Sequence, residues 1–170
     1  MINSKDMPLH AQVWIYQSIR EFSENEIAPL KTKAESFISD WTSRRKTMSA
    51  CIEIFHNRFS VVCVDEKTTS ASGCGIDKSV KFIQQLESDV DGNTFLLDRM
   101  NVAYRQARLN DEVGEGKIIS YHISELKNMI AFPERQNGIS VFKNLVNTKE
   151  ELEQNWEVAL EKSWQYKKTK

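Results

Sequence analysis

The sequence predicts an α+β fold with a mainly antiparallel sheet and about four helices. Three observations favour this class. Short β-rich runs occur in hairpin-like pairs. Two capping boxes stand at the start of segments that carry an apolar stripe with helical spacing. The order of the predicted elements is strand, helix, hairpin, helix, hairpin, helix, helix. With 170 residues the chain is long enough to bury a hydrophobic core, so we expect residues 1–170 to form a single domain.

The first predicted elements are a strand over residues 11–19, AQVWIYQSI, and a helix that follows it. Ser23 and Glu26 form an S-x-x-E capping box at the start of this helix, and Phe22 precedes it as a residue that can pack on the first turns. Pro29 removes one hydrogen bond near the start, so we expect a bend there or a helix that is regular only after it. The apolar stripe consists of Ile27, Leu30, Ala34, Phe37, Ile38 and Trp41.

A tight hairpin is predicted next, with strands over 50–56 and 59–65 and a turn near residues 57–58. Cys51 and Cys63 fall on the paired strands, where we expect them to be buried as small hydrophobic residues. Together with the preceding strand and helix, this hairpin resembles a split βαβ, or ferredoxin-like, arrangement. Such an analogy concerns the fold and carries no function.

The remaining elements continue the same pattern. A second helix is predicted from about Ile76 to residue 90, followed by two strands over 101–109 and 116–123 and a short helix over 125–131. The segment ERQNG at 134–138 is predicted to be a loop.

The C-terminal segment is predicted to be a helix over about 148–166. Thr148 and Glu151 form a second capping box at its start. Its stripe is too apolar to remain in water, so we expect the helix to pack on the domain or on a second copy, as in a homodimer. The stripe consists of Leu152, Trp156, Ala159, Leu160 and Trp164.

Composition and charge exclude several classes of function. A formal net charge of -1 removes the simplest electrostatic argument for binding nucleic acid or anionic membranes, which need a basic face. No run approaches the roughly 20 apolar residues of a membrane span, and the N-terminus lacks the apolar core of a secretory signal. The three cysteines show no CxxC spacing, which argues against a disulfide framework or a structural zinc site. We therefore expect a cytoplasmic protein.

Candidate metal ligands are scattered. His56, Asp65, Glu66 and Asp77 include no pair with a spacing diagnostic of metal binding, so no metal site is predicted.

The segment SASGCGIDKS at residues 70–79 is the strongest candidate site, and it follows VVCVDE, a β-rich run that includes Asp65. A phosphate loop requires G-x-x-x-x-G-K-[ST], with glycines where the backbone wraps the phosphates. When Lys78 is aligned with the lysine of this motif, Ser72 and Asp77 occupy the two glycine positions. Asp77 would place a side chain and a negative charge beside the phosphates. The sequence therefore predicts no ATP hydrolysis.

Other interpretations of this segment remain open. Cys74 lies between Gly73 and Gly75 just ahead of the predicted helix start, where the helix dipole and Lys78 would favour a thiolate. Alternatively, the free amides of the helix start hold an anion or a small ligand, in competition with Asp77 as a capping acid. The simplest interpretation is a small residue packed where a loop becomes a helix. The candidate catalytic residue is Cys74, and the candidate ligand-binding residues are Ser72, Gly73, Gly75, Asp77, Lys78 and Asp65.

The segments VWIYQ, RF…VDE, SGCGIDKSV, LLDR and NWEVALEKSW resemble those of a group of small bacterial proteins commonly named "ABC transporter ATPase". The resemblance covers most of the chain, and SGC-x-ID-x-SV is its most specific part. It implies ATP hydrolysis coupled to transport. The sequence contains neither an intact phosphate loop nor an LSGGQ-like segment, and the resemblance transfers no catalytic residue.

Taken together, these patterns favour a binding or interaction module that is not an ATPase and whose partner is a small ligand or a protein. One alternative is a small enzyme that uses Cys74 within the segment Gly73–Asp77. Another is a divergent nucleotide-binding protein related to the transporter ATPases. No particular cofactor is indicated.

Overall fold

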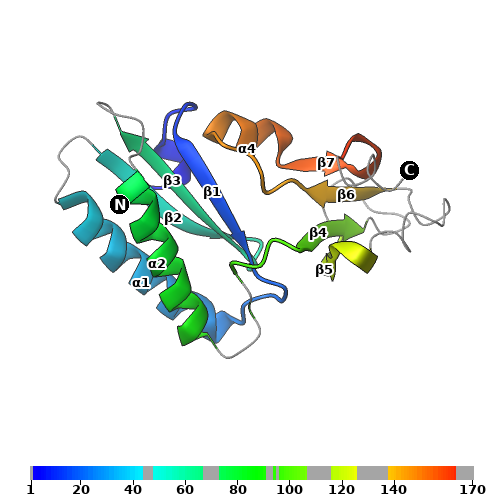
Figure 1. The fold of residues 1–170 in the computed structure, drawn as a ribbon, viewed down its shortest axis with the longest axis horizontal. Helices are drawn as coiled ribbons and strands as arrows, with labels where there is room; N and C mark the ends of the chain where they lie inside the picture. Colours follow the sequence, from blue (N-terminus) through cyan, green and yellow to red (C-terminus); the bar gives the residue numbers. More distant parts are fainter. Residues whose placement is uncertain are drawn as a thin grey trace.

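The computed structural model describes residues 2–43, 48–66, 73–90, 94, 96–106, 116–125 and 138–163, and these form an α+β fold with two antiparallel sheets (Figure 1). The first sheet has the strand order β1-β3-β2, and the second has the order β5-β4-β6-β7. Figure 1 shows the first sheet, with α1 and α2, at one end of the molecule and the second sheet at the other end. The predicted fold class is confirmed.

The first sheet is built from a split βαβ unit. Strand β3 is antiparallel to both of its neighbours, so β1 and β2 run parallel to each other with β3 between them, and α1 connects them. This is the arrangement that the sequence predicts for the first part of the chain. The elements are η1 (Ser4–Asp6), β1 (Gln12–Gln17), α1 (Glu24–Ser43), β2 (Met48–Phe55), β3 (Phe59–Glu66) and α2 (Gly73–Asp89).

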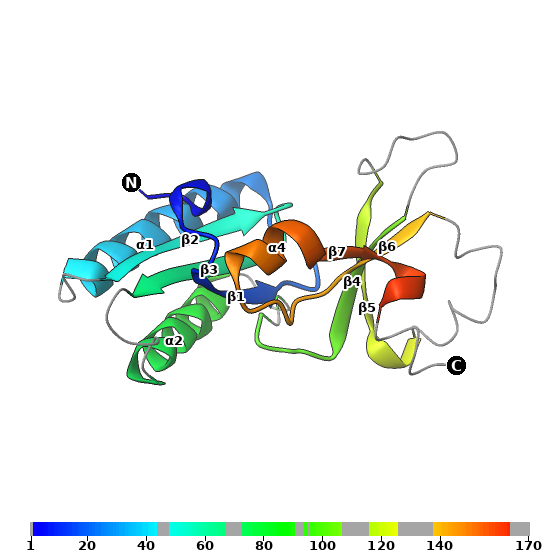
Figure 2. The same cartoon turned by 90° about the horizontal axis from the view of Figure 1, so that it is seen from above.

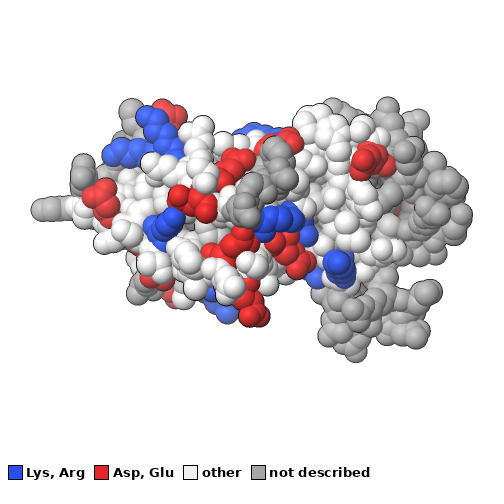
Figure 3. All heavy atoms as spheres, turned by 90° about the horizontal axis from the view of Figure 1, so that it is seen from below, with Lys and Arg blue, Asp and Glu red and all other residues white. Residues whose placement is uncertain are grey.

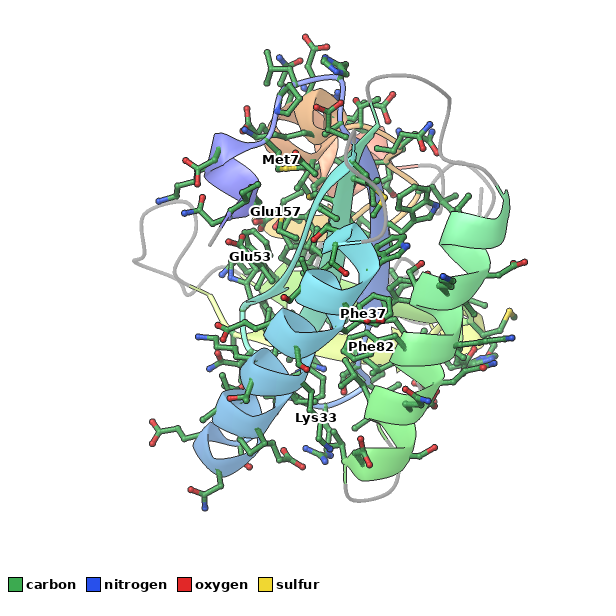
Figure 4. The ribbon with its side chains drawn as sticks, turned by 90° about the vertical axis from the view of Figure 1, so that its left-hand side faces the viewer. Met7, Lys33, Phe37, Glu53, Phe82 and Glu157 are labelled. Atoms are coloured by element: carbon green, nitrogen blue, oxygen red, sulfur yellow. The ribbon has the colours of Figure 1, made fainter. Side chains whose placement is uncertain are left out.

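One face of the first sheet packs against α1 and α2. Because side chains alternate along a strand, Tyr16, Ala50 and Val62 point to the same face, and they share one apolar cluster with residues of both helices. The two helices touch through Phe37 and Phe82, whose rings stack with centroids 4.2 Å apart (Figure 4). The predicted stripe of α1 is thus the face that builds this core.

The opposite face of the first sheet contributes to a second core that also contains residues of the second sheet. Cys51 and Cys63 lie directly opposite each other on β2 and β3 and are buried there, as predicted. Their cluster includes Ala103 of β4 and Phe142 of β6. The two sheets are therefore joined through a common hydrophobic core.

Helix α1 begins at the predicted capping box. The Glu26 carboxylate accepts hydrogen bonds from the Ser23 backbone N–H at 2.8 Å and from the Arg20 guanidinium at 2.7 and 2.9 Å. The helix begins at Glu24 and continues through Pro29, so the expectation that it becomes regular only after Pro29 is wrong, and the alternative expectation of a bend there stays a prediction. The buried residues Leu30, Ala34 and Trp41 hold the helix on the sheet beyond the proline.

The β2–β3 hairpin turns through His56 and Asn57, which both have a positive φ of 50°. The Arg58 N–H donates to the Phe55 carbonyl at 3.0 Å and closes the turn. The Arg58 side chain is buried and donates to the carbonyls of Ile19, at 2.7 Å, and of Ile118 in β5, at 3.3 Å. One arginine thus ties the hairpin to the second sheet.

The second sheet contains the predicted strands and two that the sequence did not reveal. Strands β4 and β5 form an antiparallel pair within the predicted ranges 101–109 and 116–123. Strand β6 pairs with β4, and β7 pairs with β6. The elements of this part are β4 (Asn101–Gln106), β5 (Ile118–His122), β6 (Ile139–Phe142), α4 (Lys149–Asn155), β7 (Glu157–Ala159) and η3 (Leu160–Lys162).

The predicted C-terminal helix over 148–166 is wrong beyond its first two turns. Thr148 caps α4 as predicted, because its hydroxyl accepts the Glu151 N–H, but the helix ends at Asn155. The chain then forms β7, where Val158 lies opposite Val141 of β6. Pairing with a strand that is distant in sequence outweighs the local helical pattern. Trp164 lies outside the described residues.

Helix α2 begins at Gly73, earlier than the predicted start at Ile76. The segment from Gly73 to Asp77 is therefore helical rather than a loop, and Asp77 does not belong to the first turn of the helix. Residues 123–125 are helical, while the rest of the predicted helix over 125–131 and most of the predicted loop over 134–138 lie outside the described residues. Within the described part of the chain, no helix has the length and apolar character needed to cross a membrane.

Candidate functional site

A cavity of about 590 Å³ lies along the outer edge of β1, and we call it the β1 groove. Its walls come from β1, from the segment that precedes β4, and from the segment that joins β6 to α4. Figures 1 and 2 both show this last segment running beside β1. The volume lies within the range of about 300–1,000 Å³ that is typical of ligand pockets. The lining residues are 13–17, 80, 96–99, 101–102, 142 and 144–147.

The outer edge of β1 is paired at both ends and open in the middle. At one end the Val13 N–H donates to the Asn147 carbonyl at 2.9 Å, and beyond the other end the Ile19 N–H donates to the Thr94 carbonyl at 3.0 Å. Backbone groups alternate in direction along a strand, so the N–H and C=O of Ile15 point to this same edge. Neither group has a hydrogen-bond partner among the described residues. The groove therefore contains a backbone N–H and a C=O of one edge-strand residue that are unpaired within the described part of the chain.

Apolar side chains form most of the groove wall. Apolar side chains from both faces of β1 line the groove on either side of the strand edge. Leu145 lies at the rim of the groove, with 59% of its surface exposed. An exposed leucine beside an open strand edge is suited to contact with an apolar partner. The apolar lining includes Trp14, Ile15, Val80, Leu96, Leu97, Phe142 and Val146.

The charged groups of the groove lie on the segment that precedes β4. Arg99 is exposed, lines the groove and forms no ion pair within the described part of the chain. The neighbouring Asp98 is engaged, because its carboxylate accepts the Met100 N–H and the Asn101 side-chain amide, each at 2.8 Å. Burial raises the pKa of Tyr16, and the nearby Ser79 hydroxyl and the charge of Arg99 oppose this shift. Arg99 therefore supplies a positive charge close to a buried phenol.

A network of amides closes the groove at the Gln17 end of β1. The Gln17 side chain is buried, donates to the Ser120 hydroxyl at 3.0 Å and accepts from the Asn144 amide at 2.8 Å. Asn144 in turn accepts the Trp156 indole N–H at 3.0 Å. These bonds fix the position of the wall that faces β1.

The residues that the sequence singled out lie outside the β1 groove. Asp77 and Lys78 are exposed in the second turn of α2, and Gly73 and Gly75 belong to its first turn. Ser72 and the side chain of Cys74 lie outside the described residues, so the enzyme alternative stays a prediction.

The placement of Lys78 differs from that of a phosphate-loop lysine. In such loops the lysine and the following hydroxyl residue stand where the helix begins, with the backbone amides around the phosphates. Here the neighbouring Ser79 is buried, and its hydroxyl donates to the Ile76 carbonyl at 2.7 Å. Lys78 and Ser79 therefore occupy ordinary positions within the helix rather than its start.

Asp65, the remaining candidate, is buried near the end of β3. One of its carboxylate oxygens lies 3.2 Å from Nε2 of His10, whose side chain is 78% exposed. This contact was not predicted from the sequence. Among the described residues, no group of three or more histidine, cysteine, aspartate or glutamate side chains is arranged to hold a metal ion.

Charges on the surface are mixed. Figure 3 shows lysine and arginine side chains interspersed with aspartate and glutamate on the face seen from below, without a region of a single sign. In comparisons with family models, curated proteins and solved structures, no match to this chain was found.

The groove residues were not identified from the sequence, because the signal is absent from any single segment. Residues 11–19 read as a largely buried strand, and nothing in them shows that one edge stays open. The one local hint is Leu145, an apolar residue within the polar turn KNLVN.

Proposed function

We propose that the protein is a binding module that takes up an extended segment of a partner polypeptide in the β1 groove. The observation that carries this proposal is that the backbone N–H and C=O of Ile15, at the floor of an apolar cavity, have no hydrogen-bond partner among the described residues. An extended peptide added to a strand edge gains affinity from main-chain hydrogen bonds and specificity from pockets for alternate side chains. The groove offers both features.

The closed ends of the groove limit what can pair with β1. Asn147 covers the edge at Val13, and Thr94 covers it at Ile19, beyond the end of the strand. The open stretch from Val13 to Gln17 covers four residue steps, or roughly 13 Å. A strand that already belongs to a sheet would collide with the walls on both sides. A short, flexible segment without structure of its own fits this space.

The placement of Lys78 and Ser79 supports a binding module over a nucleotide-binding protein. Lys78 stands in the second turn of α2, while Ser79 uses its hydroxyl within the helix. Asp77 adds an exposed negative charge beside them. None of the three residues lines the β1 groove.

The proposal is tested by titrating the ¹⁵N-labelled protein with a panel of N-acetylated pentapeptides. Each peptide carries valine, leucine or phenylalanine at its third and fifth positions and threonine elsewhere. We expect at least one peptide to shift the amide resonances of residues 13–17 and 144–147 in a saturable manner. If no peptide of the panel binds, or if the shifts fall elsewhere on the protein, the proposal is wrong.

Two matched variants and modified peptides locate the binding. Leu145→Asp should abolish peptide binding, whereas Leu9→Asp, at a leucine that is also exposed but lies outside the groove, should not. N-methylation along the peptide should weaken binding at every second residue only, because alternate N–H groups face β1. Equal effects of all N-methyl groups would show that no strand pairing occurs.

A further inference from the structure

We propose that the peptide taken up in the β1 groove ends there, and that Arg99 binds its terminal carboxylate. This inference rests on the proposed function and specifies the partner as the free C-terminus of a polypeptide with an apolar last residue. Three features of the groove lead to it, namely an unpaired cation, a closed end and the chemistry of the remaining lining groups.

The unpaired cation is the first feature. Among the described residues that line the groove, Arg99 is the only positive charge and Asp98 the only negative one. The Asp98 carboxylate is held by the Met100 N–H and the Asn101 amide, while Arg99 forms no ion pair within the described residues. The guanidinium is therefore available to an anionic group of the ligand.

The closed end is the second feature. The Asn144–Gln17 hydrogen bond joins the two walls at 2.8 Å, and the Ile19–Thr94 bond covers the β1 edge just beyond it. Arg99 lines the groove two residues before Asn101, and the Gln17 side-chain amide donates to the Asn101 carbonyl at 3.4 Å, so the segment that carries Arg99 reaches this end of the groove. A chain that pairs with the open stretch of β1 cannot continue along the edge past Gln17, so a terminus beside Arg99 fits better than an internal acidic residue, whose chain would have to continue.

The chemistry of the ligand group follows from the lining. A single guanidinium binds a carboxylate through two parallel N–H···O bonds. Phosphate groups are usually held by several cations or by a cradle of backbone amides, whereas Arg99 is the one cation among the described residues that line the groove. The other main-chain groups of the peptide would meet the open N–H and C=O of Ile15.

The experiment compares the best-binding pentapeptide of the panel as a free acid and as a C-terminal amide. For the native protein we expect the acid to bind about tenfold more tightly than the amide, as for one charge-assisted contact. In Arg99→Gln the acid should lose this advantage, while the affinity of the amide stays unchanged. In the control Lys31→Gln, at a cation outside the groove, the tenfold difference should persist. Higher salt should reduce the difference for the native protein.

The outcomes separate the two proposals. Equal binding of acid and amide to the native protein would overturn the role of Arg99 and leave a groove that binds internal segments. A preference for the acid that survives in Arg99→Gln would also overturn it, because another group would then hold the carboxylate. If no peptide of the panel binds in either form, the proposed function itself is rejected. Amide spectra of each variant verify that the fold is retained.

Discussion

At the scale of single residues, the start of α1 depends on one carboxylate. Glu26 accepts hydrogen bonds from the Ser23 backbone N–H and from Arg20, so it both caps the helix and fixes the connection from β1. The Arg20 hydrogen bonds, followed by the Ser23 N–H, lower the pKa of Glu26 to about 2 from an ordinary value of 4.5. The carboxylate is thus stabilised in its charged form by the folded protein.

Replacing Glu26 by Gln should lower the free energy of unfolding at pH 7 by about 1–2 kcal/mol, as for the loss of a helix cap and a surface ion pair. The lowered pKa sets the pH window. The contribution is complete above pH 4.5 and is lost as the pH falls toward 2, because the folded protein must then take up the proton that the unfolded chain has already bound. Urea titrations of both proteins at several pH values measure the difference. A difference that is constant from pH 7 to pH 2 would contradict this account.

The buried cysteines give a second prediction at this scale. A hydrogen bond with Cys51, together with burial, raises the pKa of Cys63, so its reactive thiolate form is suppressed. In a Cys74→Ser variant we therefore expect no thiol to react with iodoacetamide at pH 8 until denaturant is added. The same reagent tests the enzyme alternative in the native protein. If Cys74 reacts no faster than Cys51 and Cys63, that alternative should be dropped.

At the scale of elements, the start of α2 bears on nucleotide binding. Lys78 lies in the second turn of the helix, and Ser79 is buried with its hydroxyl bonded to Ile76. We expect the purified protein to show no magnesium-dependent release of phosphate from ATP. ATP should not change the melting temperature of the native protein, and it should not change that of Lys78→Ala either. ATP hydrolysis that disappears in Lys78→Ala would instead favour the nucleotide-binding alternative.

The segment from α4 to β7 is held by Trp156. Its ring lies 4.9 Å from Phe59 and 5.2 Å from Phe142, measured between centroids, and its indole N–H donates to Asn144 at 3.0 Å. Trp156→Ala should lower the free energy of unfolding by about 3–5 kcal/mol, as for other large core truncations. Trp156→Phe keeps much of the ring packing and should cost less. An unchanged melting temperature of Trp156→Ala would show that this segment contributes nothing to the fold.

The same segment shows how far the sequence could predict the structure. The Thr148 cap and the burial of Leu152, Trp156 and Leu160 follow from local patterns and were predicted correctly, whereas Ala159 of the same predicted stripe is exposed. The end of α4 was not predicted, because Val158 pairs with Val141, and nothing in the local sequence reveals that partner. The β1 groove escaped prediction for the same reason. Whether β1 is an edge strand depends on the order of three strands, which is a property of the whole sheet.

At the scale of the whole molecule, the two sheets share polar contacts as well as a core. Arg58 of the first sheet binds the Ile118 carbonyl of the second, and Gln17 binds Ser120. Phe59 and Phe142, one from each sheet, are buried in the same cluster. Separating the sheets would expose this cluster and leave the Arg58 charge and the Gln17 amide without their partners. Neither sheet is therefore expected to be stable alone.

We accordingly expect the protein to unfold as a single cooperative unit, in line with the predicted single domain. Far-ultraviolet circular dichroism follows both sheets, whereas amide exchange can follow Val62 of β3 and Val141 of β6 separately. The transitions from both methods should coincide in urea, and the two amides should exchange with similar free energies of opening. Arg58→Met removes a donor to carbonyls on both sides of the junction and should shift both transitions together. If the amide of Val141 instead exchanges through an opening that leaves Val62 protected, the second sheet unfolds independently. The junction that forms the β1 groove would then be a mobile interface between two units.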